Sequence, residues 1–216
     1  MSDPETAPAA RRSASTLAPG LYVTATPIGN AADISLRALD VLKAADLVLC
    51  EDTRVTAKLF AIHGIEAKMA PYHDHNAAEM RPRVLKRLEA GERIALVSDA
   101  GTPLISDPGF KLVREAVAAG FTVTTLPGAS SVMAALTLAG LPTDRFFFGG
   151  FLNAKQEARR KELADLAAVP ATLVFLESAN RLAASLADMA SALGGRDAAV
   201  ARELTKKFEE VRRGTL

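Results

Sequence analysis

The sequence predicts an α/β protein whose strands pair mainly in parallel. From Leu21 onward, short apolar runs alternate with longer segments in which apolar residues recur at helical spacing. Strands that alternate with helices in this way are typical of a parallel or mixed sheet with flanking helices. Length and composition agree, because 216 residues with 49% hydrophobic side chains can form one large domain or two small ones.

The expected elements of the first half cover residues 21–127. A strand at 21–26 precedes a helix that Ser35 caps and that ends near residue 45. A strand at 46–50 precedes a helix at 54–62, which stops at Gly64. We then expect an extended segment at 65–72, a helix opened by a capping box at 76–79, a strand at 93–97, a helix at 108–119 with Pro108 in its first position, and a strand at 121–126.

The second half is expected to continue the alternation. Helices are predicted at 132–139, at 154–167 and from a cap at Ser178 to residue 193, with strands at 146–148, 171–176 and 197–202. The best domain boundary lies near Pro127 and Gly128, which gives an N-terminal α/β domain at 21–127 and a C-terminal α/β domain at 128–216. The last element looks cut off, so we expect the second domain to be truncated at its end. Residues 1–20 are rich in Ala, Pro and Ser, and we expect a disordered leader.

Composition narrows the function classes. The formal charge is +1, from 26 basic and 25 acidic side chains, so overall charge makes no case for nucleic-acid binding. The single cysteine, Cys50, permits no internal disulfide, which favours a cytoplasmic location. No apolar run approaches the roughly 18 residues of a membrane helix, so we expect no membrane partner. Three basic clusters keep an RNA partner open, although such clusters are more often solvated surfaces: Arg81, Arg83, Lys86 and Arg87; Arg159, Arg160 and Lys161; Lys206, Lys207, Arg212 and Arg213.

Three loops at predicted strand ends carry more turn chemistry than a connection needs. They are residues 27–30, 98–109 and 127–131, and ligands of open α/β sheets lie at this edge. Small residues allow close backbone approach, Asp99 and Thr102 offer hydrogen bonds, and Leu104 and Ile105 offer an apolar wall. These features suit a nucleoside derivative. Tight turns with capping aspartates explain the loops about as well, so the residues alone leave both interpretations open.

The sequence motifs of several common binding and catalytic sites are absent or incomplete. The sequence has no G-x-x-x-x-G-K-[ST] and no G-x-G-x-x-G, so P-loop and dinucleotide sites lack their phosphate cradle. A hydrolase nucleophile at Ser130 is disfavoured, because all three histidines precede it. His73 and His75 could hold a metal with His63, Glu51 or Asp52, but no ligand spacing supports this, and we expect no metal site.

Six motifs occur together in the order and spacing of one family. They are TPIGN (26–30), EDTR (51–54), HDHN (73–76), SDAGTPLISDPG (98–109), LPG (126–128) and ARELTK (201–206). On these motifs residues 21–216 resemble the ribosomal RNA small subunit methyltransferase I family of the tetrapyrrole methylase superfamily. The resemblance implies two α/β domains, S-adenosyl-L-methionine in the cleft between them, and a homodimer. It also implies methylation of the 2′-hydroxyl of a cytidine in the decoding region of small-subunit (16S) rRNA, so that the rRNA or the assembled small subunit is the partner.

The resemblance carries a set of cofactor-binding residues onto this sequence: Pro27, Asp99, Ala100, Gly101, Thr102, Ile105, Ser130, Ser131 and Leu176. The chain also departs from the family's pattern at four positions. Leu176, Ala179 and Asn180 stand where the family has tyrosine, proline and histidine, and Asn153 stands where it has proline. These departures concern RNA contacts of the second domain rather than the fold.

The catalytic candidates follow from the chemistry of the reaction. A ribose hydroxyl is a poor nucleophile while protonated, so a nearby base would help, and the candidates are Glu51, Asp52, Asp99, His73 and His75. Arg54 is the candidate for a bidentate contact with an RNA phosphate. Capping carboxylates and a solvated arginine explain the EDTR motif as well. Two other function classes stay open, namely a small-molecule methyltransferase of tetrapyrrole type and a non-catalytic module that binds S-adenosylmethionine.

Overall fold

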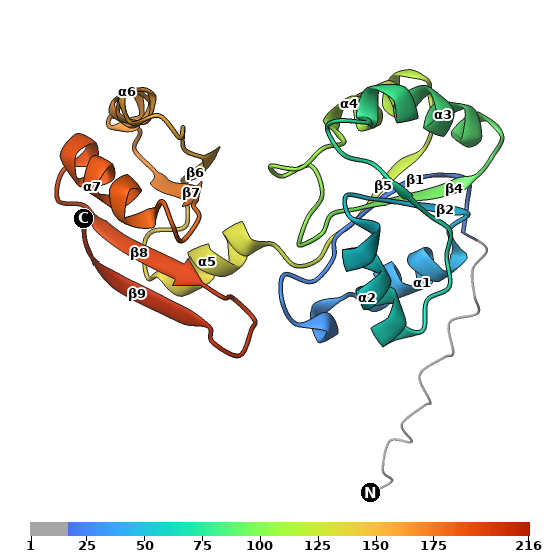
Figure 1. The fold of residues 1–216 in the computed structure, drawn as a ribbon, viewed down its shortest axis with the longest axis horizontal. Coiled ribbons are helices and arrows are strands. Elements are labelled where there is room, and N and C mark those ends of the chain that lie inside the picture. The colour runs from blue at the N-terminus through green and yellow to red at the C-terminus, as the bar shows by residue number, and fades with distance from the viewer. Residues whose placement is uncertain (1–16) are drawn as a thin grey trace, which may run out of the picture.

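The fold is that of a computed structural model, which describes residues 17–216 (Figure 1). Most of the expected leader, residues 1–16, lies outside the described residues. Gly20, which we expected to belong to the leader, already begins the first strand. The elements in chain order are β1 (Gly20–Thr24), η1 (Ala31–Asp33), α1 (Leu36–Ala44), β2 (Leu47–Cys50), α2 (Thr53–His63), β3 (Met69–Pro71), α3 (Ala77–Glu89), β4 (Arg93–Val97), α4 (Phe110–Ala118), β5 (Val123–Leu126), α5 (Ser131–Ala139), β6 (Phe146–Phe151), α6 (Gln156–Leu166), β7 (Thr172–Leu176), α7 (Leu182–Leu193), β8 (Asp197–Arg202) and β9 (Glu210–Thr215).

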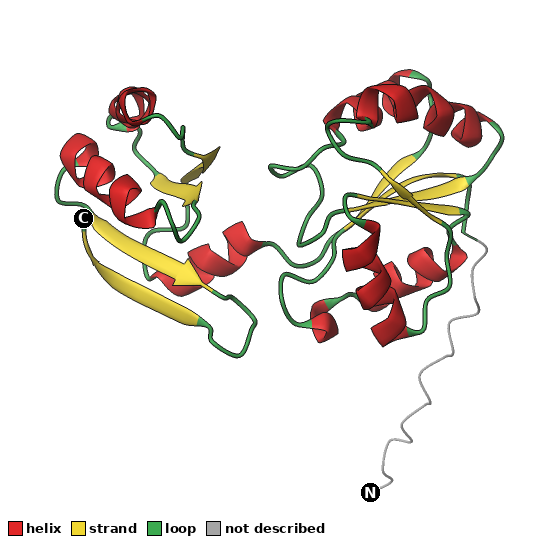
Figure 2. Ribbon diagram, in the orientation of Figure 1, coloured by secondary structure: helices red, strands yellow, loops and turns green. Residues whose placement is uncertain are grey.

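A five-stranded sheet forms the centre of the first half. Its strand order is β3-β2-β4-β1-β5, and every neighbouring pair is parallel. Its three central strands are apolar and buried almost throughout, because helices cover both faces (Figure 2). The predicted α/β class with parallel pairing is confirmed.

The two faces of this sheet have separate apolar cores. On one face α1 and α2 pack through side chains such as Leu42 and Phe60. On the other face α3 and α4 pack through side chains such as Val84 and Leu112. The loops that leave the neighbouring strands β1 and β4 therefore run to opposite faces, which is the switch point at which open α/β sheets hold their ligands.

The second half contains two small sheets. β6 and β7 pair in parallel, and β8 and β9 pair antiparallel. A buried ion pair joins α6 to α7, because the guanidinium of Arg159 donates to the Asp188 carboxylate (Nε to Oδ2 2.8 Å). Arg213 of β9 donates to the last carbonyls of α5, including that of Ala139 at 3.1 Å. The division into domains at residue 127 stays a prediction.

Several predicted helix ends are confirmed and several starts are wrong. Ser35 caps α1, and Gly64 ends α2 in the left-handed conformation. The expected capping box of α3 does not form, because the Asn76 side chain accepts instead from the backbone of the preceding turn. α4 begins two residues after Pro108, and α7 begins four residues after Ser178. Across the described residues, no helix has the length and apolar character needed to cross a membrane.

Candidate functional site

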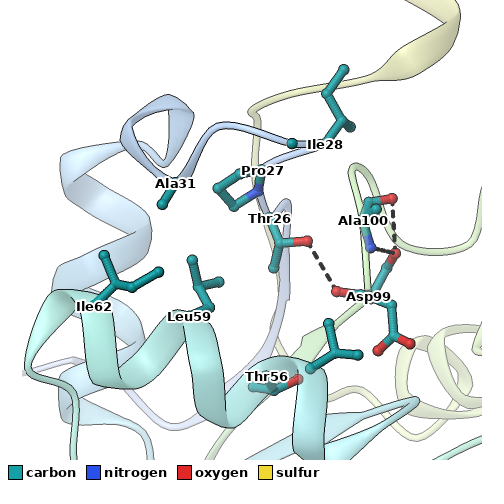
Figure 3. Close-up of a pocket in the computed structure, with 12 residues that line it drawn as sticks. Thr26, Pro27, Ile28, Ala31, Thr56, Leu59, Ile62, Asp99 and Ala100 are labelled. Atoms are coloured by element: carbon teal, nitrogen blue, oxygen red, sulfur yellow. Dashed lines mark hydrogen bonds between the residues drawn. The ribbon is translucent and has the colours of Figure 1, made fainter. Parts of the chain in front are cut away.

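A pocket of about 230 Å³ lies at the switch point of the five-stranded sheet (Figure 3). Its walls come from three segments, namely the loop after β1, the loop after β4, and one side of α2. The lining residues are Thr26, Pro27, Ile28, Gly29 and Ala31; Ser98, Asp99 and Ala100; and Val55, Thr56, Leu59 and Ile62. Two of the three loops singled out in the sequence therefore meet at one site.

A short backbone bridge holds these two loops together. The N–H of Thr26 donates to the carbonyl of Gly101 at 2.9 Å, and the N–H of Gly101 donates to the carbonyl of Thr26 at 3.1 Å. The Thr26 hydroxyl also donates to the carbonyl of Ser98 at 2.9 Å. Because backbone and side chain are both engaged, the rim of the pocket is fixed from β1 and β4 at once.

The third loop joins the site at Gly101. This residue has φ +89°, and a Cβ on it would lie 3.1 Å from Ile28 Cγ2 and 3.5 Å from the carbonyl oxygen of Ala129. The Thr102 hydroxyl donates to the same carbonyl at 3.1 Å. Ser130 caps α5 by accepting from the backbone N–H of Met133. A small residue is thus required where all three loops converge, which fits a cradle for a bound small molecule.

The proposed cofactor residues fall into three groups. Pro27, Asp99 and Ala100 line the pocket. Gly101 and Thr102 lie against the carbonyl of Ala129, beside the pocket. Ser130 follows Ala129 in the chain, and Ser131 is the first residue of α5. The remaining two do not line the pocket: Ile105 is 46% exposed on the loop after β4, and Leu176 ends β7 in the second half. The cofactor role of all nine residues stays a prediction.

Acidic side chains gather where β2 and β4 end. The Asp52 N–H donates to Asp99 Oδ1 at 3.0 Å, which ties the EDTR motif to the loop after β4. The pKa of Glu51 is raised, first by partial desolvation of its carboxylate and then by repulsion from Asp107, Asp99 and Asp74. The pKa of Asp107 is raised as well, again mainly by burial. A raised pKa makes a carboxylate a stronger base than an ordinary one, which is the direction that a general base requires.

Asp52 and Arg54 are engaged with one another. The Asp52 carboxylate caps α2 by accepting the Arg54 N–H at 2.8 Å, and it also accepts from the Arg54 guanidinium at 2.6 Å. These hydrogen bonds lower the pKa of Asp52 to about 2. The capping interpretation therefore fits Asp52, whose carboxylate is a weak base. The Arg54 side chain is 87% exposed and can still exchange this partner for a phosphate.

The HDHN motif follows β3 and contributes His73 and His75, whose ring centroids are 5.9 Å apart. The Nδ1 atom of His73 is buried and has no hydrogen-bond partner. His63 lies elsewhere, with its Nε2 3.0 Å from the carbonyl of Ala31. Within residues 17–216, no three His, Cys, Asp or Glu side chains converge as metal ligands would.

Sequence reasoning missed part of the site. The side of α2 that lines the pocket bears Val55, Leu59 and Ile62, whose helical spacing was a detectable signal. Asp107 was inside a quoted motif but was not singled out. Asp107 lies near Asp99 of the same loop and near Asp74, which follows β3, and only the fold brings Asp74 beside it.

One of the basic clusters is not a free cationic surface. Arg159 is buried and ion-paired with Asp188, which also accepts from Arg160 Nε at 2.7 Å. Both arginines therefore connect α6 to α7 within the second half. In the other clusters Arg83 pairs with Glu79, and several more arginines have acidic partners.

An open α/β sheet with a pocket at its switch point places this chain among the α/β proteins that hold a ligand beyond the carboxyl ends of their strands. Residues 20–216 match the family of Tetrapyrrole (Corrin/Porphyrin) Methylases. A ribosomal RNA small subunit methyltransferase I of Mesorhizobium japonicum is 56% identical over 201 residues, 93% of this chain and 68% of the relative. Its counterpart in Escherichia coli O157:H7 is 50% identical over 192 residues, 88% of this chain and 67% of that protein. The chain therefore belongs to the tetrapyrrole methylases, and within them to the ribosomal RNA small subunit methyltransferase I family.

Solved structures share the fold at low identity. A uroporphyrin-III C-methyltransferase from Thermus thermophilus, complexed with S-adenyl homocysteine, superposes with a TM-score of 0.62 at 21% identity, over 91% of this chain and 88% of that one. A cobalt precorrin-4 methyltransferase superposes with a TM-score of 0.64 at 21% identity, over 90% of this chain and 84% of that one. These likenesses extend the fold assignment to both halves of the chain.

Proposed function

We propose that this chain transfers a methyl group from S-adenosyl-L-methionine to the 2′-hydroxyl of a cytidine ribose in the decoding region of 16S rRNA. The proposal rests mainly on the 56% identity to a ribosomal RNA small subunit methyltransferase I over 93% of the chain. The chain is an S-adenosylmethionine-dependent rRNA methyltransferase, and the cytidine 2′-O target is the finer part of the proposal. The partner is the small-subunit rRNA or the assembled subunit.

The methyl donor is proposed to bind where the three loops converge. When bound, S-adenosylmethionine supplies an electrophilic methyl group on its sulfonium. The residues around the Thr26–Gly101 bridge fit such a ligand, because Gly101 lets the three loops pack closely at the edge of the pocket, where a Cβ would press on Ile28. Pro27, Asp99 and Ala100 would form the pocket side, and Thr102, Ser130 and Ser131 would form the other side. Ile105 and Leu176 are proposed to join it from the loop after β4 and from the second half.

The protein's own contribution is alignment and proton transfer. Fixed loops hold both substrates in line, and orientation of this kind can supply about 7–11 kcal/mol of a barrier. Glu51 is our proposed base, because its raised pKa brings it closer to neutral than the other carboxylate of its motif, Asp52. It would accept the proton of the ribose hydroxyl as that oxygen attacks. His73, His75 and Asp99 are the remaining candidates.

A second function class is a tetrapyrrole methyltransferase, which the solved neighbours favour by fold alone. Labelled S-adenosylmethionine separates the two classes when it is offered with purified small subunits or with a porphyrin precursor. We expect label in the RNA only. Label in the porphyrin precursor would reverse the assignment, and donor binding with no label in either would indicate a non-catalytic binding module.

We also propose a homodimer, on the family resemblance. Size-exclusion chromatography with light scattering at micromolar concentration tests this, with twice the chain mass as the expected result. A monomer across that range would contradict it for this chain.

A further inference from the structure

The loop between β8 and β9, residues 203–209, reaches from the second half to the rim of the pocket. We call this segment the hairpin loop. The Asn30 N–H donates to the Thr205 hydroxyl at 3.2 Å, a contact between residues 175 positions apart. Asn30 ends the TPIGN motif, and its own side chain caps η1 by accepting from Ala32. The hydroxyl of Thr205 therefore holds the end of the loop that lines the pocket.

Gly29 makes this approach possible. A Cβ at position 29 would lie 2.4 Å from Lys206 Cγ and 3.0 Å from the carbonyl oxygen of Leu204. Backbone of the hairpin loop thus lies directly against the backbone of a pocket residue. Leu204 is also buried, so packed contacts accompany the exposed hydrogen bond between Asn30 and Thr205.

The hairpin loop is held in a strained conformation. Glu203 has φ +52° and Thr205 has φ +65°, in the left-handed region that β-branched residues rarely adopt. The strain is held locally, because the Thr205 N–H donates to the Glu209 carboxylate at 2.7 Å. Among the described residues, the only other non-glycine positive φ values belong to Leu104 and Ser106, in the loop after β4. Strain of this kind persists where the surroundings require it, and it concentrates at functional sites.

We propose that Thr205 is a positioning residue for the donor site, and that it acts through Asn30. The hairpin loop places the Thr205 hydroxyl against the TPIGN loop, which sets the position of Pro27 and Gly29 on the pocket wall. The second half of the chain thereby shapes a pocket built from the first half. This inference rests on the proposed function, because it assumes that the TPIGN loop contacts the methyl donor.

Thr205→Val tests the proposal, since valine keeps the shape and removes only the hydroxyl. Thr205→Ser is the matched control that keeps the hydroxyl. Calorimetric affinity for S-adenosylhomocysteine is measured together with the melting temperature and the hydrogen-exchange rate of the Asn30 amide without ligand. We expect the valine variant to bind roughly threefold to tenfold more weakly, as for one lost hydrogen bond, and to lose protection at Asn30. The serine variant should match the wild type in both measurements.

Gly29→Ala provides a second perturbation from the other side of the contact. It should weaken ligand affinity and expose the Asn30 amide in the same way, without touching Thr205. Wild-type protein that fails to bind S-adenosylhomocysteine would refute the proposed function itself. Normal wild-type binding with unchanged affinity in the Thr205→Val variant would overturn the positioning role, whatever its melting temperature and whatever Gly29→Ala does. An equal loss of affinity in the serine control would overturn it as well.

Discussion

Replacement of Glu51 by glutamine separates catalysis from folding at the proposed site. Glutamine keeps the size of the side chain and removes its ability to accept a proton. A general base contributes about 10²–10⁴-fold to rate. That loss equals roughly 2.7–5.4 kcal/mol of transition-state free energy, at 1.36 kcal/mol per factor of ten.

The neighbours of Glu51 determine what should happen to stability. Its pKa is raised by desolvation and by the nearby carboxylates, so the folded protein favours the protonated side chain. The ionised side chain therefore reduces stability once the pH exceeds its folded pKa. Neutral glutamine avoids this loss, so the variant should melt at the same or a higher temperature at pH 7. The difference should vanish as the pH falls below the ordinary glutamate pKa of about 4.3.

The assay is single-turnover methylation of purified small subunits, with the melting temperature measured on the same samples. Asp52→Asn is the matched control, because asparagine caps a helix as well as aspartate does and this carboxylate is a weak base. Its rate should stay within about threefold of the wild type, less than 1 kcal/mol. A Glu51→Gln rate equally close to the wild type would refute the assignment of the base and return the search to His73, His75 and Asp99.

Three further variants test the proposed donor site at Gly101, the ion pair between Asp46 and Arg93, and the proposed RNA contact of Arg54. Gly101→Ala should cost about 1–3 kcal/mol in chemical unfolding, because its φ of +89° strains a side-chain-bearing residue, and it should weaken S-adenosylhomocysteine binding in calorimetry. The Arg93 guanidinium lowers the pKa of Asp46 to about 2, so its stabilisation is present above the unfolded pKa of about 3.9 and is lost as the pH falls toward 2. In acid titrations of stability, Asp46→Asn should flatten that part of the curve, and an unchanged curve would contradict the linkage. Arg54→Ala should leave donor affinity intact and reduce the salt dependence of RNA binding by about one ion, whereas an unchanged slope would make Arg54 a solvated helix residue.

Local patterns predicted the first half of the fold well. The strands at β2, β4 and β5 and the ends of α1 and α2 follow from apolar runs, a capping serine and a glycine stop. The convergence of the TPIGN and SDAGTPLISDPG loops was predictable too, because carboxyl ends of parallel strands share one edge of a sheet. The cofactor and RNA assignments needed the family resemblance, since small residues in a loop also suit plain turns.

Long-range partners were beyond local reasoning. Arg159 read as a solvated cation because its buried partner, Asp188, stands 29 residues away on another helix. The contact of Thr205 with Asn30 depends on how two halves of the chain meet, and no spacing in the sequence encodes it. Asn76 failed as a cap because its side chain satisfies the turn before the helix instead. In each case the outcome depended on a hydrogen-bond partner that the local sequence pattern does not specify.

The central claim is that this chain methylates a ribose of small-subunit rRNA. Its most direct test is to incubate the protein with small subunits that lack ribose methylation in the decoding region and with labelled S-adenosylmethionine, and then to map modified nucleotides by mass spectrometry. We predict one 2′-O-methylcytidine in that region, formed by the wild-type chain and strongly reduced with Glu51→Gln. Label on a base, label outside the decoding region, or no label despite measurable donor binding would contradict the account.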